Sequence, residues 1–396
     1  MVANKSICFI SETSGFGGTE VHTISLIKLL LERNYNIRII SCGHNFYDEK
    51  FKMIQGERVK FIKTDISVNE ETDTSRKKWR SLLSEIDSDT LILPKGWNEM
   101  GSIGFLKTCR KSFRKIYFIE HLEADPMPKK TSKQYFRGLA KGVGFWWYKQ
   151  KHYRKARSFY ADRIVAVSNI VAKSLFDESG YPSDKVFVVQ NGVFWKNIER
   201  NLLSGKNIRE RFNIPKESLI FGMLTRLNHV KGVDIAVRAF DSLTKKIPEK
   251  AVYLMIAGTG PEEKEIKSLV NNLELDEKVV FTGFFENPLD ALSSFDVILF
   301  PSRKEGLPLA LLEGMAAGCI PIVSNVSGMP EAVNSNELGW VVPMENVTEL
   351  TKAMFNVLQL DEEAIQKKRV NVRNRIKNNF DAEKNYSELL NILGLI

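Results

Sequence analysis

The sequence predicts an α/β protein made of two doubly wound domains in tandem. A length of 396 residues exceeds that of a typical single domain, and 43% hydrophobic and 27% charged residues are typical of globular proteins. Short β-branched runs alternate with helical patterns, as in a parallel sheet with helices on both faces. The same alternation restarts in the second half of the chain, so we expect a second sheet.

Each expected strand is a short apolar run, and helical patterns such as 20–33 and 101–114 separate the runs. In the first half we expect strands at 6–11, 37–41, 60–63, 90–94, 115–120, 163–168 and 186–190. In the second half we expect them at 219–224, 252–258, 279–283, 297–302, 320–324 and 339–343. We therefore place the two domains at residues 1–195 and 196–375. Helical spacing over about 361–396 predicts a helical tail.

The two halves of the chain differ in charge. Residues 1–195 carry 32 Lys and Arg against 21 Asp and Glu, whereas the remainder carries 25 against 27. An anionic partner of the first half would explain the difference, and nucleic acid, an anionic membrane surface and a phosphorylated acceptor all fit. A solvated lysine-rich face explains it equally well. Because no recognisable nucleic-acid-binding module is present, we expect no nucleic-acid partner.

The four cysteines, Cys8, Cys42, Cys109 and Cys319, are scattered and form no metal-binding pattern. They indicate packing residues, a reduced cytoplasmic compartment and no structural metal. No apolar run approaches the roughly 20 residues that span a bilayer. The N-terminal stretch is too short and too polar for a signal-peptide core.

The stretch 302–321, SRKEGLPLALLEGMAAGCIP, places two glutamates in an apolar context. Pro308 can open a helix at its first position, and the residues after it are apolar nearly all round, which is typical of a buried helix. Leu307 is a poor cap, so the first N–H groups of this helix are free to bind a phosphate. Glu313 lies about 7 Å further along the helix axis, and Glu305 lies just ahead of the helix. Carboxylates on either side of a phosphate suit the hydroxyls of a nucleotide-sugar, and two salt-bridged structural glutamates are the alternative.

Residues that follow the strands matter most, because ligands bind beyond the carboxyl ends of strands in open α/β sheets. Arg226 and Lys231 follow the expected strand 219–224, and Gly232 gives the loop backbone freedom. Two cations beside a helix start make a natural diphosphate clamp, and a pair of solvated surface cations is the alternative.

Two further loops follow strands in the first half. After the first strand, Gly17 and Gly18 would let the backbone approach a ligand at a helix start, although a plain tight turn explains them equally well. His121 follows the strand 115–120, where a ligand contact and a structural role are evenly balanced.

Several short motifs together resemble those of the retaining glycosyltransferases of family 4. They are GGTE (17–20), VAVSN (165–169), NGV (191–193), TRLNHVKG (225–232), GTGP (258–261), FTGFFENP (281–288) and EGLPLALLEGMAAG (305–318), of which the last is the most specific. The resemblance covers nearly the whole chain. It implies the GT-B fold, in which two Rossmann-like domains face each other across a cleft and a C-terminal helix, here 376–396, returns to the first domain.

The resemblance implies a role for each matching residue. Glu313 would bind the nucleotide ribose, and Glu305 would hold hydroxyls of the donor sugar. Arg226 and Lys231 would bind the diphosphate and stabilise the leaving nucleoside diphosphate, while His121 would contact the donor sugar from the first domain. The rest of the nucleotide-sugar site, with the two phenylalanines at the base, would be Gly17, Gly18, Phe284, Phe285, Gly306, Leu309 and Ala310.

The resemblance also implies a reaction. A hexosyl unit would pass from a UDP-sugar, or a GDP-sugar, to a carbohydrate or lipid-linked acceptor hydroxyl in glycan, polysaccharide or glycolipid biosynthesis. The family retains the anomeric configuration and uses no divalent metal, so we expect no cofactor, and the two cations would supply the positive charge. Thr225, Gly314 and Met329 depart from the family pattern without changing a charged site residue. A sugar phosphorylase, a nucleotide-sugar epimerase and a non-catalytic anionic-ligand-binding protein stay open as alternatives.

The segment 133–163 is the stretch least typical of the family, because it interleaves aromatic residues with lysines and arginines. This combination is typical of interfacial membrane helices. One hypothesis is a cytoplasmic protein that docks peripherally on the inner face of a membrane, or grips a lipid-linked acceptor, through this segment. A core-packed helix pair with one solvated basic face is the alternative.

Overall fold

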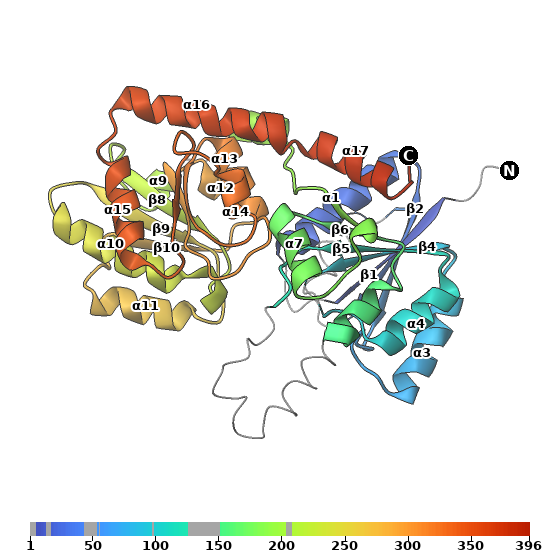
Figure 1. Cartoon of the computed structure of the whole chain (residues 1–396). Helices are drawn as coiled ribbons and strands as arrows, with labels where there is room; N and C mark the ends of the chain where they lie inside the picture. Colours follow the sequence, from blue (N-terminus) through green and yellow to red (C-terminus); the bar gives the residue numbers. More distant parts are fainter. Residues whose placement is uncertain are drawn as a thin grey trace, which may run out of the picture. The chain divides into compact units, whose positions relative to one another are not determined.

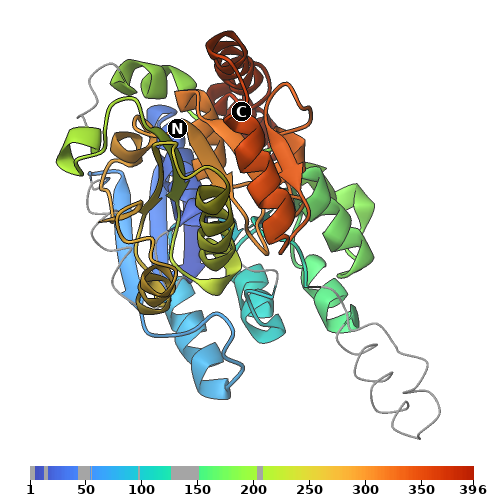
Figure 2. The same ribbon diagram turned by 90° about the vertical axis from the view of Figure 1, so that its left-hand side faces the viewer.

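The computed structural model describes residues 5–12, 17–42, 54, 56–96, 99–125, 151–202 and 208–396. The chain divides into two compact units, the first made of Met1–Gln190 with Glu388–Ile396 and the second of Asn191–Ser387. Each unit contains one parallel sheet with helices packed on its faces, as two views of the ribbon show (Figures 1 and 2).

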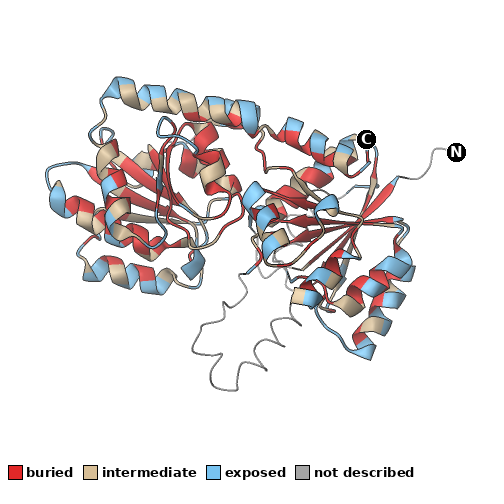
Figure 3. Cartoon of the chain, in the orientation of Figure 1, coloured by how far each residue is buried: buried red, intermediate tan, exposed pale blue. Residues whose placement is uncertain are grey.

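The first unit is built on a parallel sheet with the strand order β3-β2-β1-β4-β5-β6-β7. Its strands are largely buried because helices cover the sheet (Figure 3), which explains why they are continuous apolar runs in the sequence. The strands are β1 (Ser6–Glu12), β2 (Asn36–Cys42), β3 (Val59–Thr64), β4 (Thr90–Lys95), β5 (Lys115–Glu120), β6 (Arg163–Ala166) and β7 (Val186–Val188).

The helices of the first unit connect these strands, and each exposes one face to solvent (Figure 3). They are α1 (Gly18–Glu32), α3 (Asp73–Ser84), α4 (Ile103–Ser112) and α7 (Asn169–Asp177), and residues 151–158 are also helical. Serine and threonine side chains cap several of them. Thr72 is the N-cap of α3 and Ser168 is the N-cap of α7. Each side chain accepts a hydrogen bond from a backbone N–H of the first turn.

The second unit repeats the design with the strand order β10-β9-β8-β11-β12-β13, again fully parallel. Its strands are β8 (Leu219–Leu224), β9 (Val252–Ala257), β10 (Val279–Gly283), β11 (Val297–Phe300), β12 (Ile320–Ser324) and β13 (Trp340–Val342). All thirteen expected runs of the two units form strands whose ends lie within two residues of the expectation. The predicted α/β class with two Rossmann-like sheets is confirmed.

Helices cover both faces of the second sheet. On one face α10 (Val233–Lys246), α11 (Glu263–Asn272) and α15 (Val347–Val357) build the core against β8 and β9. On the other face α13 (Leu309–Ala317) contacts α8 (Trp195–Leu202), α12 (Pro288–Leu292) and α16 (Glu362–Asn379). The short helices α9 (Ile208–Arg211) and α14 (Met329–Ala332) complete this unit.

The helical tail expected over about 361–396 consists of two helices, and the C-terminal helix expected at 376–396 begins later, at Ala382. The helix α16 ends at Asn379, and α17 (Ala382–Ile392) begins three residues later, after Asp381 has paired with Val193 in a β-bridge. Residues 388–396 pack within the first unit, where the hydroxyl of Tyr117 donates to the carbonyl of Leu393 at 2.7 Å. The predicted return of the tail to the first domain is therefore confirmed.

In both sheets the strand order changes direction beside the first strand, between β1 and β4 and between β8 and β11. Such a switch point opens a crevice at the carboxyl ends of the strands. All four cysteines are buried, as expected of packing residues. Among the described residues, no helix is long and apolar enough to cross a membrane.

Candidate functional site

Two loops meet at the switch point of the second sheet. One follows β8 and contains Arg226 and Lys231, and the other follows β11 and contains Glu305. Gly232 has a left-handed φ of 64°, and a Cβ atom on it would lie 2.1 Å from the carbonyl oxygen of Pro301. Only glycine allows both this conformation and this approach, so the two loops lie in contact.

Lys231 and Glu305 form the central ion pair of the site. The Lys231 Nζ lies 2.7 Å from Glu305 Oε1, and the Ser302 hydroxyl donates to the same oxygen at 2.9 Å. Glu305 is only 4% exposed, so the pair is well shielded from solvent. Among the described residues, none donates a hydrogen bond to Glu305 Oε2. From the sequence we expected this lysine to bind the diphosphate and this glutamate to bind the sugar, and in the structure the two side chains are in direct contact.

Serine residues that the sequence analysis missed hold the Glu305 loop in place. The Ser327 hydroxyl accepts the N–H of Glu305 at 3.1 Å, and the Ser324 hydroxyl donates to the carbonyl of Ser302 at 2.5 Å. The predicted site residue Gly306 is buried in the same loop, where its carbonyl accepts the N–H of Gly328 at 2.6 Å. These bonds tie the loop after β11 to the loop after β12.

Arg303 is a further residue that was not predicted from the sequence. Its guanidinium binds both carboxylate oxygens of Asp234 at 2.9 Å and the carbonyl of His229 at 2.7 Å. Burial opposes ionisation of Asp234, but the hydrogen bonds and charge of Arg303 outweigh it and lower the pKa of this carboxyl. Arg303 thereby fixes the loop that carries Lys231 to the start of α10.

Arg226 is exposed, and its guanidinium pairs with no carboxylate among the described residues. The backbone around it is nevertheless fixed by the GTGP turn. A Cβ on Gly258 would lie 1.9 Å from the Thr225 carbonyl, and one on Gly260 would lie 2.2 Å from the Leu227 carbonyl. The turn therefore packs directly under the Arg226 loop and leaves the Arg226 side chain available to a ligand.

The helix α13 begins without a side-chain cap, as expected. The expected position of Pro308 was wrong by one residue, because Pro308 is the N-cap and Leu309 is the first helical residue. The proline carries no hydroxyl or carboxylate, so the N–H groups at Leu309 and Ala310 stay open to a ligand. Asn191 steadies this start by donating from Nδ2 to the carbonyl of Leu307 at 2.7 Å.

Glu313 lies on the least buried stripe of α13. Its neighbours on that stripe, Ala310 and Ala317, are also partly exposed, and their small side chains leave room beside the carboxylate. No side chain among the described residues pairs with Glu313. Although the residue is partly exposed, its carboxyl group is surrounded by protein, and this burial raises its pKa from 4.5 to about 7. The alternative of two salt-bridged structural glutamates therefore does not hold for Glu313, although Glu305 does pair with Lys231.

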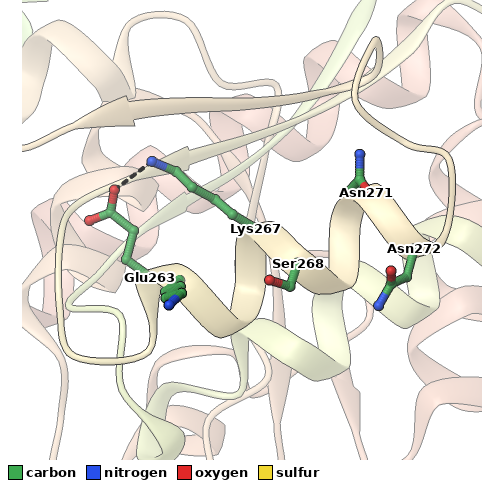
Figure 4. Close-up of a pocket in the computed structure, with 6 residues that line it drawn as sticks. Glu263, Lys267, Ser268, Asn271 and Asn272 are labelled. Carbon is green, nitrogen blue, oxygen red and sulfur yellow. Dashed lines mark hydrogen bonds and ion pairs between the residues drawn. The ribbon is translucent and has the colours of Figure 1, made fainter.

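Phe284 and Phe285 follow β10, at the same edge of the sheet. Phe284 is 62% exposed and Phe285 is half-buried. A separate pocket lies along α11 and is lined by polar side chains, with Lys267 paired to Glu263 at 2.7 Å (Figure 4). It contains none of the predicted site residues.

The first unit contributes a second set of predicted residues, at the carboxyl edge of its own sheet. Gly17 is the N-cap of α1, and no side chain caps this helix start. His121 follows β5 and is buried, with the ring of His22 edge-on at 4.8 Å. Burial, with a smaller effect of His22, lowers the pKa of His121 well below 6.5, so its ring is neutral at pH 7. Its Nε2 finds no hydrogen-bond partner in the described part of the chain.

The basic aromatic segment 133–163 is described only from residue 151, and residues 133–150 lie outside the described residues. In the described part Tyr153 and Phe159 are exposed, whereas Arg154 and Arg157 are buried. Within the described ranges, no cluster of three or more His, Cys, Asp or Glu residues is arranged to hold a metal ion.

Both units match known protein families. Residues 16–194 match the family described as Glycosyltransferase Family 4, and residues 204–379 match Glycosyl transferases group 1. The O-antigen biosynthesis glycosyltransferase WclY of Escherichia coli is 32% identical over 185 residues, covering 46% of this chain and 50% of the relative. The chain thus spans about half the length of the relatives it matches first. An uncharacterized glycosyltransferase of Methanocaldococcus jannaschii is 26% identical over 391 residues, covering 94% and 93% of the two chains.

Solved structures share the fold over almost the whole length. A glycosyltransferase from Rickettsia africae superposes with a TM-score of 0.75 at 20% identity, covering 99% of this chain and 98% of the other. HepE from Anabaena, solved in complex with UDP and glucose, gives a TM-score of 0.75 at 15% identity and covers 98% and 99%.

Proposed function

The chain belongs to the GT-B glycosyltransferases of the family 4 type, and from this premise we propose that it moves a hexosyl unit from a nucleotide-sugar to an acceptor hydroxyl. The observation that carries the proposal is the Lys231–Glu305 pair beside the uncapped start of α13, with the unpaired Glu313 one turn further along. Cations, open N–H groups and carboxylates are thus gathered in one unit, and they match the diphosphate, sugar and ribose of such a donor.

Each group of the donor has a binding residue in this proposal. Lys231, Arg226 and the N–H groups of Leu309 and Ala310 bind the diphosphate. Glu313 accepts hydrogen bonds from the ribose hydroxyls, and Glu305 accepts them from the sugar through Oε2, the oxygen that Lys231 and Ser302 do not bind. Gly306 shapes the loop between these groups, and Phe284 and Phe285 line the base.

In this proposal the positive charges of the site promote the transfer reaction. As the glycosidic bond breaks, negative charge grows on the leaving phosphate, and Lys231 and Arg226 stabilise that charge without a divalent metal. The acceptor hydroxyl attacks from the face of the departing diphosphate, which takes the hydroxyl proton, so the anomeric configuration is retained. We assign no protein group as general base.

The first unit offers ligand-binding groups of its own. The neutral ring of His121 has an Nε2 without a hydrogen-bond partner among the described residues, and this atom suits a sugar hydroxyl. The uncapped start of α1 at Gly17 and Gly18 offers backbone N–H groups to a ligand at the same sheet edge. A UDP-sugar is the favoured donor, because the structural neighbour HepE is solved with UDP, and a GDP-sugar is the alternative. The relative WclY acts in O-antigen biosynthesis, which favours a cell-surface glycan or a lipid-linked acceptor.

A direct test follows release of UDP or GDP from a panel of nucleotide-sugars, with and without a chelator. We expect Glu313→Gln to raise the Kd for UDP about tenfold, the loss of one set of charge-assisted hydrogen bonds. We expect Glu305→Gln to lower kcat about a hundredfold while changing the Kd for UDP by less than about threefold. The matched control is Glu263→Gln on α11, which removes an exposed ion pair and should change neither quantity.

The change in the Kd for UDP reports the role of Glu313, and the change in kcat reports the role of Glu305. Equal and negligible effects of both substitutions would overturn the proposed donor site. Turnover that requires inorganic phosphate instead of an acceptor hydroxyl would identify a phosphorylase. Peripheral membrane docking through 133–163 remains a separate proposal, and equal sedimentation with neutral and anionic liposomes at low salt would refute it.

A further inference from the structure

A cluster of buried charges lies in the first unit, next to His121. Lys95 ends β4 and Glu120 ends β5, and the two residues are direct partners in the register of these strands. The Lys95 Nζ lies 2.6 Å from Glu120 Oε1, and both side chains are completely buried. The Tyr181 hydroxyl lies 3.4 Å from the same nitrogen. The carboxyl edge of this sheet is therefore polar although it is shielded from water.

Two arginines of the helical stretch 151–158 point into the same interior. Arg154 and Arg157 are three residues apart and so share one helix face. Arg154 is fully partnered, because Nε and Nη2 bind Glu99 Oε1 at 2.9 and 2.7 Å and Nη1 binds the Asp125 carbonyl at 2.7 Å. Arg157 is 1% exposed, yet in the described part of the chain its Nε and Nη2 have no hydrogen-bond partner.

Arg157 takes no part in the ion pairs of this cluster. Among the described residues, Lys95 pairs with Glu120 and Arg154 pairs with Glu99, whereas Arg157 pairs with no carboxylate. The charge of Arg157 nevertheless reaches Lys95, whose pKa falls from 10.5 to about 8 because of burial and, in smaller part, because of Arg157.

The Arg157 guanidinium lies 5.9 Å from the centroid of the Tyr153 ring, a contact that leaves Nε and Nη2 without hydrogen bonds. Buried donors without hydrogen bonds are unfavourable. Arg157 therefore lacks an anionic partner among the described residues.

The sequence that precedes this helical stretch is strongly basic. Residues 126–150, which precede this helical stretch, contain six Lys and Arg and no Asp or Glu. The first 195 residues carry an excess of positive charge as a whole. The partner of Arg157 is thus more readily supplied by a ligand than by the protein, and the field of this domain attracts anions.

We propose that Arg157 binds an oxyanion of the acceptor, a phosphate or a carboxylate, at the carboxyl edge of the first sheet. That this oxyanion belongs to an acceptor rests on the proposed transferase function, whereas the anion site itself is inferred from the first unit alone. A guanidinium presents a rigid fork of donors that suits both oxyanions. Because Arg157 is shielded from water, the bond is strong, and the transferase would prefer acidic acceptors over neutral ones.

The test uses thermal unfolding of the full chain with inorganic phosphate or sodium glucuronate, each matched in ionic strength with sodium chloride. Wild type is compared with Arg157→Gln and Arg157→Lys, and Arg154→Gln is the matched control from the same helix face. Without a ligand, we expect Arg157→Gln to raise Tm, because it removes an uncompensated charge. We expect Arg154→Gln to lower Tm, because it removes the ion pair of Arg154 with Glu99.

With a ligand, we expect at least one of the two anions to raise the wild-type Tm by about 2 °C or more at saturation. Arg157→Gln should lose that rise, Arg157→Lys should keep part of it, and Arg154→Gln should keep all of it. A response to phosphate alone identifies a phosphorylated acceptor, and a response to glucuronate alone identifies an acidic sugar. An equal rise in wild type and Arg157→Gln, or no rise with either anion, overturns the proposal.

The outcome is independent of the donor site. Phosphate that binds at α13 stabilises wild type and Arg157→Gln alike, so the difference between them reports Arg157. UDP binding measured on the same proteins tests the donor site separately, and we expect Arg157→Gln to leave the Kd for UDP unchanged. Failure of UDP to bind would refute the proposed function while an Arg157-dependent anion response would still stand.

Discussion

Glu313 ionises within the working pH range of an enzyme. Burial raises its pKa to about 7, so close to neutrality the carboxyl is divided between its charged and uncharged forms. A ribose hydroxyl donates a stronger hydrogen bond to the carboxylate than to the neutral acid. Ionisation of Glu313 with rising pH should therefore strengthen nucleotide binding and lower the stability of the fold.

The affinity for UDP should fall as the pH falls. Between pH 8 and pH 6 the ionised fraction of a group with a pKa of about 7 drops roughly tenfold, and we expect the Kd for UDP to rise by about that factor. Isothermal titration calorimetry of wild type and Glu313→Gln measures it. Titration of the UDP phosphate is common to both proteins, so a wild-type profile as flat as that of Glu313→Gln would contradict the role of Glu313.

Stability should respond in the opposite direction. The folded-state pKa of Glu313 is raised above 4.5, so its contribution to stability is fully present below pH 4.5 and is lost as the pH rises through 7. We expect Glu313→Gln to stabilise the second unit by about 2 kcal/mol at pH 8 and by little at pH 5. Urea unfolding at the two pH values measures this, and an equal gain at both would show that packing, not charge, is responsible.

At the level of residues, the sequence was sufficient to propose which residues form the site, but not which of them contact each other. The spacing of Glu305 and Glu313 around an uncapped helix start was enough to predict a nucleotide-sugar site. The pairing of Lys231 with Glu305 was not predictable, because these residues are 74 positions apart and meet only when two loops pack. Ser327 and Arg303 were missed for the same reason, since their partners Glu305 and Asp234 are 22 and 69 positions away along the chain.

At the level of elements, the loop between β8 and α10 depends on one glycine. Gly232 combines a left-handed φ with a contact that leaves no space for a Cβ. Gly283 in the same unit is a matched control, because its φ is 73° but no atom lies within 4 Å of an added Cβ. The two positions share the conformational requirement and differ only in the available space.

We expect Gly283→Ala to cost about 1 kcal/mol in the free energy of unfolding, the usual cost of a left-handed alanine. Gly232→Ala should cost about 3 kcal/mol or more, because the loop must also move away from Pro301. It should weaken UDP binding as well, since Lys231 moves with the loop. Urea unfolding and UDP titration of both variants check this, and equal costs would show that the close approach is unimportant.

Strands were the most predictable elements. Parallel strands buried on both faces are continuous apolar runs, so their sequence signal is strong. Helix ends were less predictable. Pro308 is compatible with both the N-cap and the first helical position, and only tertiary packing decides between them. The break between α16 and α17 depends on the β-bridge of Asp381 to Val193, a contact between distant segments that helical periodicity does not reveal.

At the level of the whole molecule, the first unit is assembled from two separate parts of the chain. Residues 388–396 supply buried leucines and backbone acceptors for Tyr35 and Tyr117. The alternation of strands and helices predicted the two units, but it gave no sign of which side chains of the first would receive the tail. That part of the expectation came from the family resemblance alone.

Removal of residues 388–396 should destabilise the first unit. The loss of Leu389, Leu390 and Leu393, each at most 1% exposed, should lower its unfolding temperature by more than about 10 °C. Leu393→Ala should give a smaller shift in the same direction, and Ile396→Ala, at 59% exposure, should give none. Differential scanning calorimetry measures the unfolding temperature of the first unit in each variant. A truncated chain whose first unit unfolds at the wild-type temperature would show that residues 388–396 do not stabilise this unit.

This discontinuity has a consequence for biosynthesis. A ribosome makes residues 1–190 first, yet it completes the unit they belong to only after all of Asn191–Ser387 has been made. The second unit is contiguous, so it has every residue it needs before the first one does. During translation the partner sites of Tyr35 and Tyr117 stay vacant, and the earlier-made part of the chain is the later to mature.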